Sequence, residues 1–361
     1  MLRRALVALP LAAVALAACS TSAPAPEAAP QAPATSPSPT PSPTPSPTPS
    51  PTPTPTSPLT GLPGNPAGPV LVVKLDNTRN AQPHAGLHRA DVIYIEEVEY
   101  GITRLAAVYS SDVPDRIGPV RSARITDIDL LAQYGSPAFA FSGVQRKMWP
   151  AIEESSLIDI SPNKGAEGYG RDRDRRSPYN YFLDGTVGLA RAPDASPARD
   201  IGLRFDPMVP AGGSPVYSAR AEWSYATADF VYDPAQGNFL VGLNDDLAMA
   251  EETGEQQRAD TVVLQYVTQS ESKYFDKGGG NTPHAETIGT GTGIVLRDGQ
   301  SWNVTWSRPD AASGTTFLQT DGTPMTFRPG QTWVVLLDTT RPAILQTTAS
   351  ASPTASPTAT P

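Results

Sequence analysis

Two arginines beside a predicted helix start are the clearest candidates for a binding site. Residues 118–124 open with Gly-Pro, which favours a turn, and contain Ser122, a residue type that caps helices. Apolar residues with helical spacing follow from 125 to 131. Arg121 and Arg124 therefore flank a helix N-terminus, where guanidinium groups and free backbone amides together attract an anion.

The negative partner of these arginines can take two forms. Arginine is unfavourable for the dipole at a helix N-terminus, so a negative group is expected close by. An internal carboxylate, such as Glu99 or Asp127, would make Arg121 and Arg124 a structural feature. An external anion would make them a binding site, and the sequence leaves both alternatives open.

Two glutamates lie at the end of a predicted hairpin. Residues 91–99 alternate with the period of a strand, and the Tyr-Gly pair that follows is typical of a two-residue turn. Such a turn would place Glu97 opposite Arg104 and Glu99 opposite Ile102. An ion pair between Glu97 and Arg104 would explain these charges structurally. The functional alternative is that Glu99, which has no partner of its own in this register, points into a cleft as an acid, a base or a hydrogen-bond acceptor.

A strand predicted over residues 69–75 ends at Asp76 and Asn77. This pair either closes a turn or presents its side chains at a site. We expect the two residues to lie beside the arginines. The predicted anion cleft then consists of seven residues, namely Asp76, Asn77, Glu99, Arg104, Arg121, Ser122 and Arg124.

The single cysteine, Cys19, follows a short apolar run that begins after two arginines. The run is too short to cross a bilayer as a permanent helix. The tetrapeptide Leu-Ala-Ala-Cys ending at Cys19 resembles a bacterial lipobox, which implies that residues 1–18 are a signal peptide and that Cys19 is lipidated. Each buried methylene contributes about 0.8 kcal/mol, so two or more acyl chains anchor a protein stably. We therefore expect a membrane anchor at the outer face of the cytoplasmic membrane.

Both ends of the chain have compositions that cannot build a core. Residues 19–58 are almost entirely Pro, Thr, Ser and Ala, with repeated Ser-Pro-Thr-Pro units. Proline removes amide donors and favours polyproline II, so we expect a disordered tether on the order of 100 Å long, at about 3.1 Å per residue. Such a tether would carry the folded part into the cell wall. A disordered tail of similar composition is expected over 342–361.

The remaining residues, 59–341, have ordinary globular composition and suffice for two domains. We predict an α+β domain over 59–210 and a β-rich domain over 211–341. Strands of the second domain are predicted at 229–232, 261–267, 293–296, 302–306 and 332–337, with an Asp-Gly hairpin turn at Asp298. Trp302, Trp306 and Trp333 lie in these strands, where core packing is more frequent than carbohydrate stacking.

Charge and histidine content exclude some classes of partner. The formal net charge is -9, and it becomes -11 when Arg3 and Arg4 leave with the signal peptide. Nucleic-acid binding requires a basic surface, so we expect no nucleic-acid partner. His84 and His88 have the spacing of zinc ligands on a helix, but Gly86 weakens a helix there and no activating glutamate accompanies them. We expect no metal and no cofactor.

Several motifs resemble the DUF3048 family across nearly the whole globular part. They are Pro-Leu-Thr-Gly at 58–61, the stretch 87–104 with Gly-Ile-Thr-Arg, Gly-Pro-Val-Arg-Ser-Ala-Arg at 118–124, Gly-Thr-Gly at 291–293, Arg-Asp-Gly at 297–299, Thr-Trp-Ser-Arg at 305–308 and Pro-Gly-Gln-Thr-Trp at 329–333. The resemblance implies an N-terminal and a C-terminal family domain. The family is named for its unknown function, so the resemblance implies no mechanism.

This chain departs from the family pattern at two places. Ser-Pro-Tyr-Asn at 177–180 stands where many members have Pro-His-Asn, and Tyr100-Gly101 replaces a glycine pair. A histidine general base at the first position is therefore excluded here. If an activity shared by the family depended on it, this member would be inactive. The simpler inference is that this histidine is not catalytic in the family.

These observations favour binding over catalysis. The predicted function is recognition of an anionic envelope component, such as a cell-wall polymer, a peptide carboxylate or a partner protein, by the arginine cleft. One alternative is a cell-wall glycan or peptide hydrolase or transferase that uses Glu97 or Glu99 as acid or base. Another is a structural partner in an envelope protein complex. No residue is assigned as catalytic under the favoured interpretation.

Overall fold

The computed structural model describes residues 55–63 and 68–348. Cys19, the predicted signal peptide, most of the predicted tether and residues 349–361 of the predicted tail lie outside these residues. Within them, no helix is both long and apolar enough to cross a membrane. The described residues are mostly β, and all three α-helices precede residue 191. They are α1 (Ile125–Ala132), α2 (Trp149–Glu154) and α3 (Gly185–Ala190).

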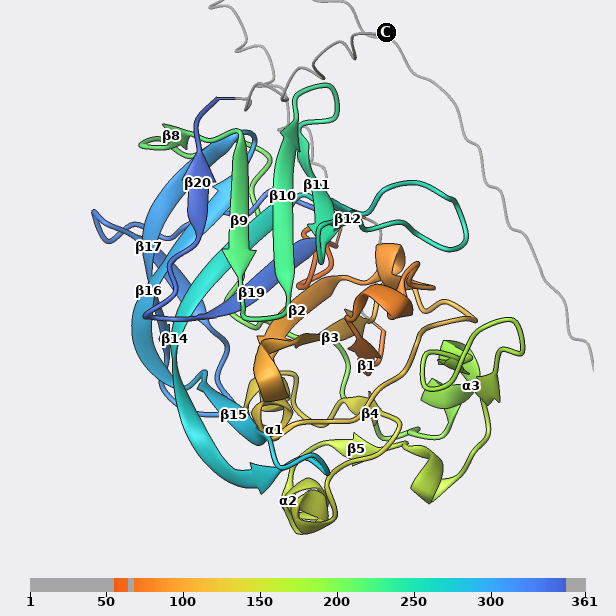
Figure 1. The fold of residues 1–361 in the computed structure, drawn as a ribbon. Coiled ribbons are helices and arrows are strands. Elements are labelled where there is room, and N and C mark those ends of the chain that lie inside the picture. The colour runs from red at the N-terminus through yellow and green to blue at the C-terminus, as the bar shows by residue number, and fades with distance from the viewer. Residues whose placement is uncertain (1–54, 64–67, 349–361) are drawn as a thin grey trace, which may run out of the picture. The chain divides into compact units, whose positions relative to one another are not determined.

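A twelve-stranded mixed sheet forms the centre of the fold (Figure 1). Its order is β18 (Thr316–Gln319), β17 (Gln300–Arg308), β16 (Gly289–Arg297), β14 (Thr261–Phe275), β19 (Thr332–Asp338), β2 (Val92–Glu97), β3 (Thr103–Tyr109), β1 (Leu71–Asp76), β4 (Ala138–Ala140) and β5 (Ile158–Asp159). Two further strands join it off this path: β15 (Asn281–Glu286) pairs with β14, and β8 (Ser214–Pro215) pairs with β17.

Strands from before and after residue 210, the predicted domain boundary, share this sheet. The junction is the parallel pairing of β19 with β2, in which Thr332 lies opposite Val92 and Val335 opposite Ile95. The antiparallel hairpin of β2 and β3 continues the sheet on one side, and the parallel pairing of β14 with β19 continues it on the other. Residues from both predicted domains therefore lie close together around β2.

A second sheet and two short elements complete the β-structure. The second sheet has the order β12 (Asp246–Leu247), β11 (Asn238–Leu243), β10 (Thr227–Asp233), β9 (Ser218–Glu222) and β20 (Ile344–Gln346), with β13 (Arg258–Ala259) paired to β11. β6 (Tyr169–Arg171) and β7 (Tyr181–Leu183) form a separate hairpin. β20 lies beyond Arg341, the predicted end of the folded part, and pairs with β9.

The large sheet is covered on both faces, as the alternation of its strands requires. Ile93 and Ile95 in β2 belong to a core that includes Phe230 and Val241 of the second sheet. Val92 and Tyr94, which point the other way, belong to a core that includes Leu130 and Leu131 of α1. The two-residue period read from the sequence of this strand is thereby confirmed.

The predicted register of the β2–β3 hairpin is wrong by one residue. Glu97 lies opposite Thr103, and Glu96, not Glu97, lies opposite Arg104. The turn is longer than two residues: Val98 N–H donates to the Ile102 carbonyl oxygen at 2.8 Å around a 3-10 turn at Glu99–Gly101. Tyr100 has a φ of 63°, a left-handed conformation that is uncommon outside glycine. The extra residue shifts the partner of every residue along the strand.

Other predictions about local structure are confirmed. Helix α1 follows the Gly-Pro turn, and the strands predicted after residue 216 correspond to β10, β14, β16, β17 and β19. Asp298 and Gly299 form the two-residue turn between β16 and β17, with φ values of 50° and 70°. Both central residues of this turn type need a positive φ, which Asp-Gly tolerates.

The three strand tryptophans pack in the core. Trp302, Trp306 and Trp333 are 3%, 3% and 0% exposed, so none offers a face to a carbohydrate. Trp333 packs edge-on against Phe230 with ring centroids 6.1 Å apart. Its indole N–H donates to the Arg258 carbonyl oxygen at 3.1 Å and to the Gln331 amide oxygen at 2.8 Å. This side chain thus joins the two sheets.

We expect Trp333→Ala to reduce the free energy of unfolding by about 4 kcal/mol, because it leaves a large cavity between the sheets. The matched control is Tyr225→Ala, since Tyr225 is 76% exposed and its loss should change stability by less than about 0.5 kcal/mol. Urea unfolding followed by circular dichroism measures both. A loss below about 1 kcal/mol for Trp333→Ala would show that the sheets do not depend on this contact.

Candidate anion-binding site

The arginine cluster lies where β1 ends, β3 begins and α1 starts. Asp76 at the end of β1 pairs in register with Arg104 of β3. The segment that leads into α1 runs beside β1, because Arg121 N–H donates to the Lys74 carbonyl oxygen at 2.7 Å. Three segments that are distant in sequence therefore bring Arg104, Arg121 and Arg124 together.

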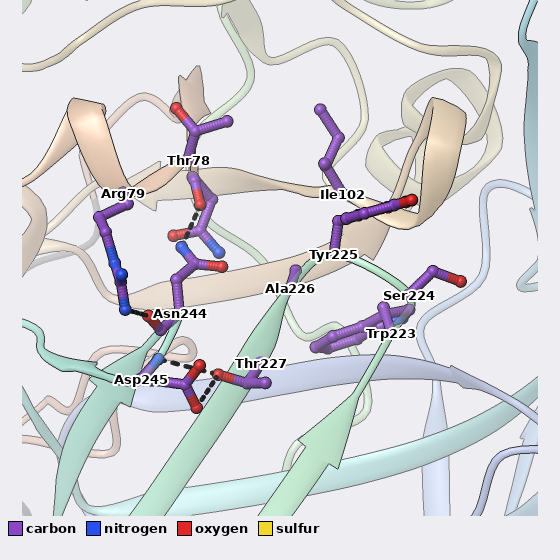
Figure 2. Close-up of a pocket in the computed structure, with 11 residues that line it drawn as sticks. Thr78, Arg79, Ile102, Trp223, Ser224, Tyr225, Ala226, Thr227, Asn244 and Asp245 are labelled. Carbon is purple, nitrogen blue, oxygen red and sulfur yellow. Dashed lines mark hydrogen bonds between the residues drawn. The ribbon is translucent and has the colours of Figure 1, made fainter.

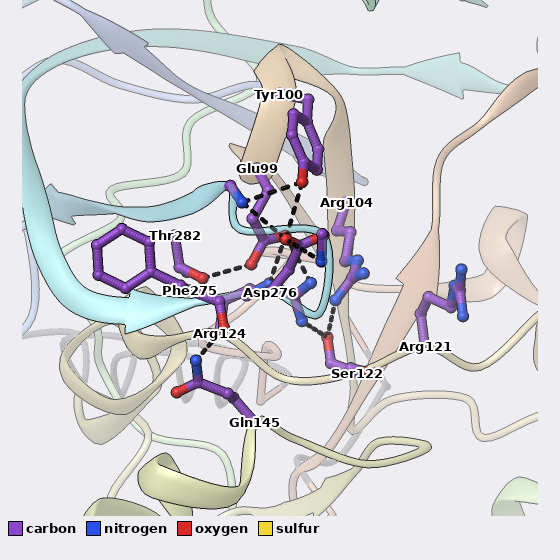
Figure 3. A network of polar contacts seen from close by, with 12 residues as sticks. Glu99, Tyr100, Arg104, Arg121, Ser122, Arg124, Gln145, Phe275, Asp276 and Thr282 are labelled. Carbon is purple, nitrogen blue, oxygen red and sulfur yellow. Dashed lines mark hydrogen bonds and ion pairs between the residues drawn. The ribbon is translucent and has the colours of Figure 1, made fainter.

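Arg124 is held by Glu99. Its Nη2 and Nε atoms lie 2.6 and 3.0 Å from Glu99 Oε2, and the hydroxyl of Thr282 donates to Glu99 Oε1 (Figure 3). Burial alone would raise the pKa of the Glu99 carboxyl, but the hydrogen bonds and charge of Arg124 outweigh it, and the pKa is lowered. Glu99 is therefore an ionised partner of Arg124, one of the two internal carboxylates that the sequence suggests.

Arg121 is held by Asp76, which the sequence did not identify as its partner. Arg121 Nε lies 2.5 Å from Asp76 Oδ2, while Asp76 Oδ1 accepts hydrogen bonds from the Thr78 amide and hydroxyl at 2.8 and 2.6 Å. Burial opposes ionisation of Asp76, but these contacts bring its pKa below the ordinary value. Figure 3 shows Arg121 pointing away from the Glu99–Arg124 pair, and its side chain is 29% exposed.

Arg104 is nearly buried and incompletely satisfied. It is 6% exposed, its Nη1 donates to the Ser122 carbonyl oxygen at 2.6 Å, and its Nε has no hydrogen-bond partner among the described residues. Burial and the charges of Arg124 and Arg121 lower the pKa of Arg104 to about 9. Three guanidinium groups thus face two carboxylates, so the cluster has an excess of positive charge.

A pocket of about 370 Å³, which we call the arginine pocket, opens beside this cluster. Glu99, Arg121, Ser122 and Arg124 line it, together with Lys277, Asp276, Tyr274 and Thr282 of the C-terminal region and the apolar side chains of Val144 and Met148. Of the seven predicted cleft residues, these four line the pocket. Arg104 and Asp76 do not line the pocket but contact residues that do. Arg104 donates to the Ser122 carbonyl oxygen, and Asp76 accepts from Arg121.

Two details of the predicted site differ from the structure. Ser122 does not cap α1: the N-cap is Arg124, whose amide donates to Asp127 Oδ2 at 2.7 Å. Ser122 instead contributes its carbonyl oxygen to Arg104. Asn77 donates to the Thr103 hydroxyl at 2.8 Å and lines a different pocket of about 390 Å³, shown in Figure 2.

Glu97, the other glutamate considered for catalysis, does not pair with Arg104 as predicted. Both of its carboxylate oxygens accept from Arg341 Nη1, at 2.9 and 3.0 Å. The one-residue register shift explains the error, because it places Thr103 where Arg104 was expected. Glu97 is not among the residues that line the arginine pocket.

Sequence reasoning missed two groups of residues at the site. One is the hairpin of β14 and β15, which supplies Thr282 and Lys277 from a distant part of the chain. The other is a fully buried set in which Lys74 and Glu96 join Asp127, and the sequence had suggested only Asp127, as a partner of the arginines. A lysine within an apolar strand was the available signal for the second group. In the described residues, no three His, Cys, Asp or Glu side chains are grouped as metal ligands.

We expect Glu99→Gln to lower the free energy of unfolding by about 2 kcal/mol at pH 7, because it leaves the largely buried Arg124 without a carboxylate. The pKa of Glu99 is lower in the folded protein than its ordinary value of 4.5. This stabilisation is therefore present above pH 4.5 and is lost as the pH falls through the folded-state pKa. Denaturant unfolding at several pH values measures the difference.

The matched control for this variant is Glu153→Gln. Glu153 forms an exposed pair with Lys164 at 3.7 Å, so its loss should have little effect at any pH. A difference between wild type and Glu99→Gln that stays constant from pH 7 to pH 3 would contradict the ion-pair account.

The comparisons with known proteins agree with the motifs in the sequence. Residues 59–197 match the model described as "Protein of unknown function (DUF3048) N-terminal domain", and residues 218–334 match the corresponding C-terminal domain. The chain is 42% identical over 72 residues to "Putative lipoprotein YerB" from Bacillus subtilis (strain 168). That match covers 19% of this chain and 22% of the relative, which is about a fifth of each.

A solved structure shows the same fold. The crystal structure of the YerB protein from Bacillus subtilis superimposes with a TM-score of 0.69, covering 81% of this chain and 99% of that chain at 19% identity. The two family models together span most of the chain, from Leu59 to Val334. The protein is a member of the DUF3048 family, with both its N-terminal and C-terminal domains.

Proposed function

We propose that this protein is a lipid-anchored protein of the cell envelope that binds an anionic envelope component in the arginine pocket. The sequence around Cys19 supports the anchor, and so does the similarity to "Putative lipoprotein YerB". Lipidation at Cys19 would hold the protein at the outer face of the cytoplasmic membrane. The long segment rich in Pro, Thr and Ser would then allow the folded part to reach the cell wall.

The observation that carries the binding proposal is the uncompensated positive charge around Ser122. Arg104, Arg121, Arg124 and Lys277 carry four positive charges, against the three carboxylates of Asp76, Glu99 and Asp276. The Nε of Arg104 has no partner in the described residues. Burying a guanidinium without a full set of acceptors is costly. A bound anion would add negative charge and relieve the mutual repulsion of the three arginines.

The pocket also limits the chemistry of the ligand. Arg121 and Lys277 offer charged donors, which suit a phosphate or carboxylate group. Val144, Met148 and Tyr274 offer apolar surface for the carbon skeleton that bears this group. A volume of about 370 Å³ accommodates one repeat or one end of a polymer, with the remainder outside. An anionic wall polymer meets these requirements.

The state of the glutamates supports binding rather than acid–base catalysis. A general acid needs a raised pKa, whereas Arg124 keeps the pKa of Glu99 low. Glu97 is occupied by Arg341 and lies outside the pocket lining. The alternative of a wall hydrolase or transferase that uses these residues therefore has less support from the geometry.

The test is co-sedimentation of the purified full chain with isolated cell walls, with and without their anionic polymers. We expect polymer-dependent pelleting that weakens as salt increases. Arg121→Gln should weaken binding about tenfold, equivalent to about 1.4 kcal/mol. Lys277→Gln, which leaves both ion pairs in place, should weaken it less. Arg79→Gln is the matched control, because Arg79 is an exposed, carboxylate-paired arginine that lines the other pocket.

Three outcomes would count against the proposal. Equal pelleting of Arg121→Gln, Lys277→Gln and wild type would place binding elsewhere, provided that circular dichroism shows the variants folded. Release of soluble wall fragments that Glu99→Gln abolishes would favour the hydrolase alternative. Absence of both pelleting and release would favour a protein partner.

A further inference from the structure

Lys74 is the central residue of a charged set inside the protein. Its Nζ lies 2.7 Å from Asp127 Oδ1 and also contacts Glu96 Oε1, and the side chains of all three residues are 0% exposed. The set differs from the exposed pair of Lys164 and Glu153, whose atoms lie 3.7 Å apart. A lysine held in contact with two carboxylates and shielded from water is a setting for chemistry as well as for ion pairing.

The fold explains how the three side chains meet. Lys74 in β1 and Glu96 in β2 lie on the face of the sheet that α1 covers, and β3 separates the two strands. Lys74 is opposite Ala106 of β3, whose small side chain leaves room for the lysine to extend across that strand. Asp127, in the first turn of α1, contacts Lys74 from the helix that covers this face of the sheet. The backbone therefore fixes all three groups in position.

The proton balance of this set favours uncharged groups. One lysine and two carboxylates carry a net negative charge when all are ionised, which is costly without water. Burial, together with the charge of Asp127, raises the pKa of Glu96 to about 7, which makes Glu96 suited to accept and release a proton. The reaction proposed below requires Lys74 as an amine and Asp127 as a carboxylic acid, and transfer of one proton across their 2.7 Å contact supplies both. Both products are neutral, as the low dielectric prefers.

We propose that Lys74 and Asp127 react to form an intramolecular amide bond, with Glu96 as the proton carrier. The lone pair of Lys74 Nζ attacks Asp127 Cγ and forms the Nζ–Cγ bond. Glu96 takes a proton from the nitrogen and delivers it to Asp127 Oδ1, whose bond to Cγ breaks as water leaves. Glu96 ends in the protonation state in which it began, and the step needs no oxidant, reductant or activating co-reactant.

One further contact and the fixed geometry of the site suit this reaction. The Arg124 amide donates to Asp127 Oδ2 at 2.7 Å, where negative charge develops when the nitrogen attacks. Holding the amine against the carboxyl replaces an encounter in solution by a fixed geometry, which can supply much of the activation free energy. The resulting bond would fasten β1 to α1 directly beneath the arginine pocket.

Mass spectrometry of the full chain tests the proposal. Denatured wild-type protein is digested with chymotrypsin, which cleaves after Leu59, so that the peptide containing Lys74 does not carry the acyl chains on Cys19. We expect the peptides that contain Lys74 and Asp127 to appear as one branched species, lighter than their sum by one water molecule. Asp127→Asn should yield a species lighter than its own sum by one ammonia molecule, because the leaving group changes. Glu96→Gln and Lys74→Arg should yield separate peptides.

The wild-type result decides the proposal even if a variant fails to fold. Separate, unmodified peptides for Lys74 and Asp127 in the wild-type digest would overturn it. A branched species that persists in Glu96→Gln would overturn the role of Glu96. The peptides containing Lys164 and Glu153 are the internal control and should remain unlinked, because this pair is exposed and lies 3.7 Å apart.

Discussion

The parallel pairing of β19 with β2 is the constraint on which the rest of the structure depends. It places strands of the C-terminal family domain inside the sheet begun by the N-terminal domain. As a result, Thr282 reaches Glu99, and Glu99 in turn fixes Arg124. A parallel pair must be joined by a long crossover, so it forms only when distant parts of the chain have come together. The arginine pocket is therefore a product of the complete fold.

The sequence predicts local structure well where one period dominates. The strands of the C-terminal region, the Asp298-Gly299 turn and helix α1 follow from alternation, turn chemistry and helical spacing. The hairpin register fails because Tyr100 adopts a left-handed conformation that its residue type rarely takes. The end of a predicted strand singled out Asp76, but its pairing with Arg121 leaves no local signal, and neither does the position of Thr282, because sheet order and loop packing bring these groups to the arginines. Asn77 follows Asp76 in sequence but faces a different pocket.

Charge inside the protein is distributed in two adjacent sets of opposite sign. Arg104, Arg121 and Arg124 exceed their carboxylates by one positive charge, whereas Glu96 and Asp127 exceed Lys74 by one negative charge. Asp127 connects the two sets, since one oxygen contacts Lys74 and the other accepts the Arg124 amide. The negative set is fully buried, so water cannot stabilise its charge. Uptake of a proton would remove that charge, and the proposed amide bond between Lys74 and Asp127 would remove the charges of those two groups. The positive set lines a pocket that a ligand can enter.

The most direct measurement of the central claim is a nuclear magnetic resonance titration that follows the arginine Nε–H signals of the full chain as purified anionic wall polymer is added. The account predicts saturable shifts in the signals of Arg104, Arg121 and Arg124, while the signal of Arg79 in the other pocket stays unchanged. Binding of the polymer with these three signals unmoved, or no binding at all, would contradict it.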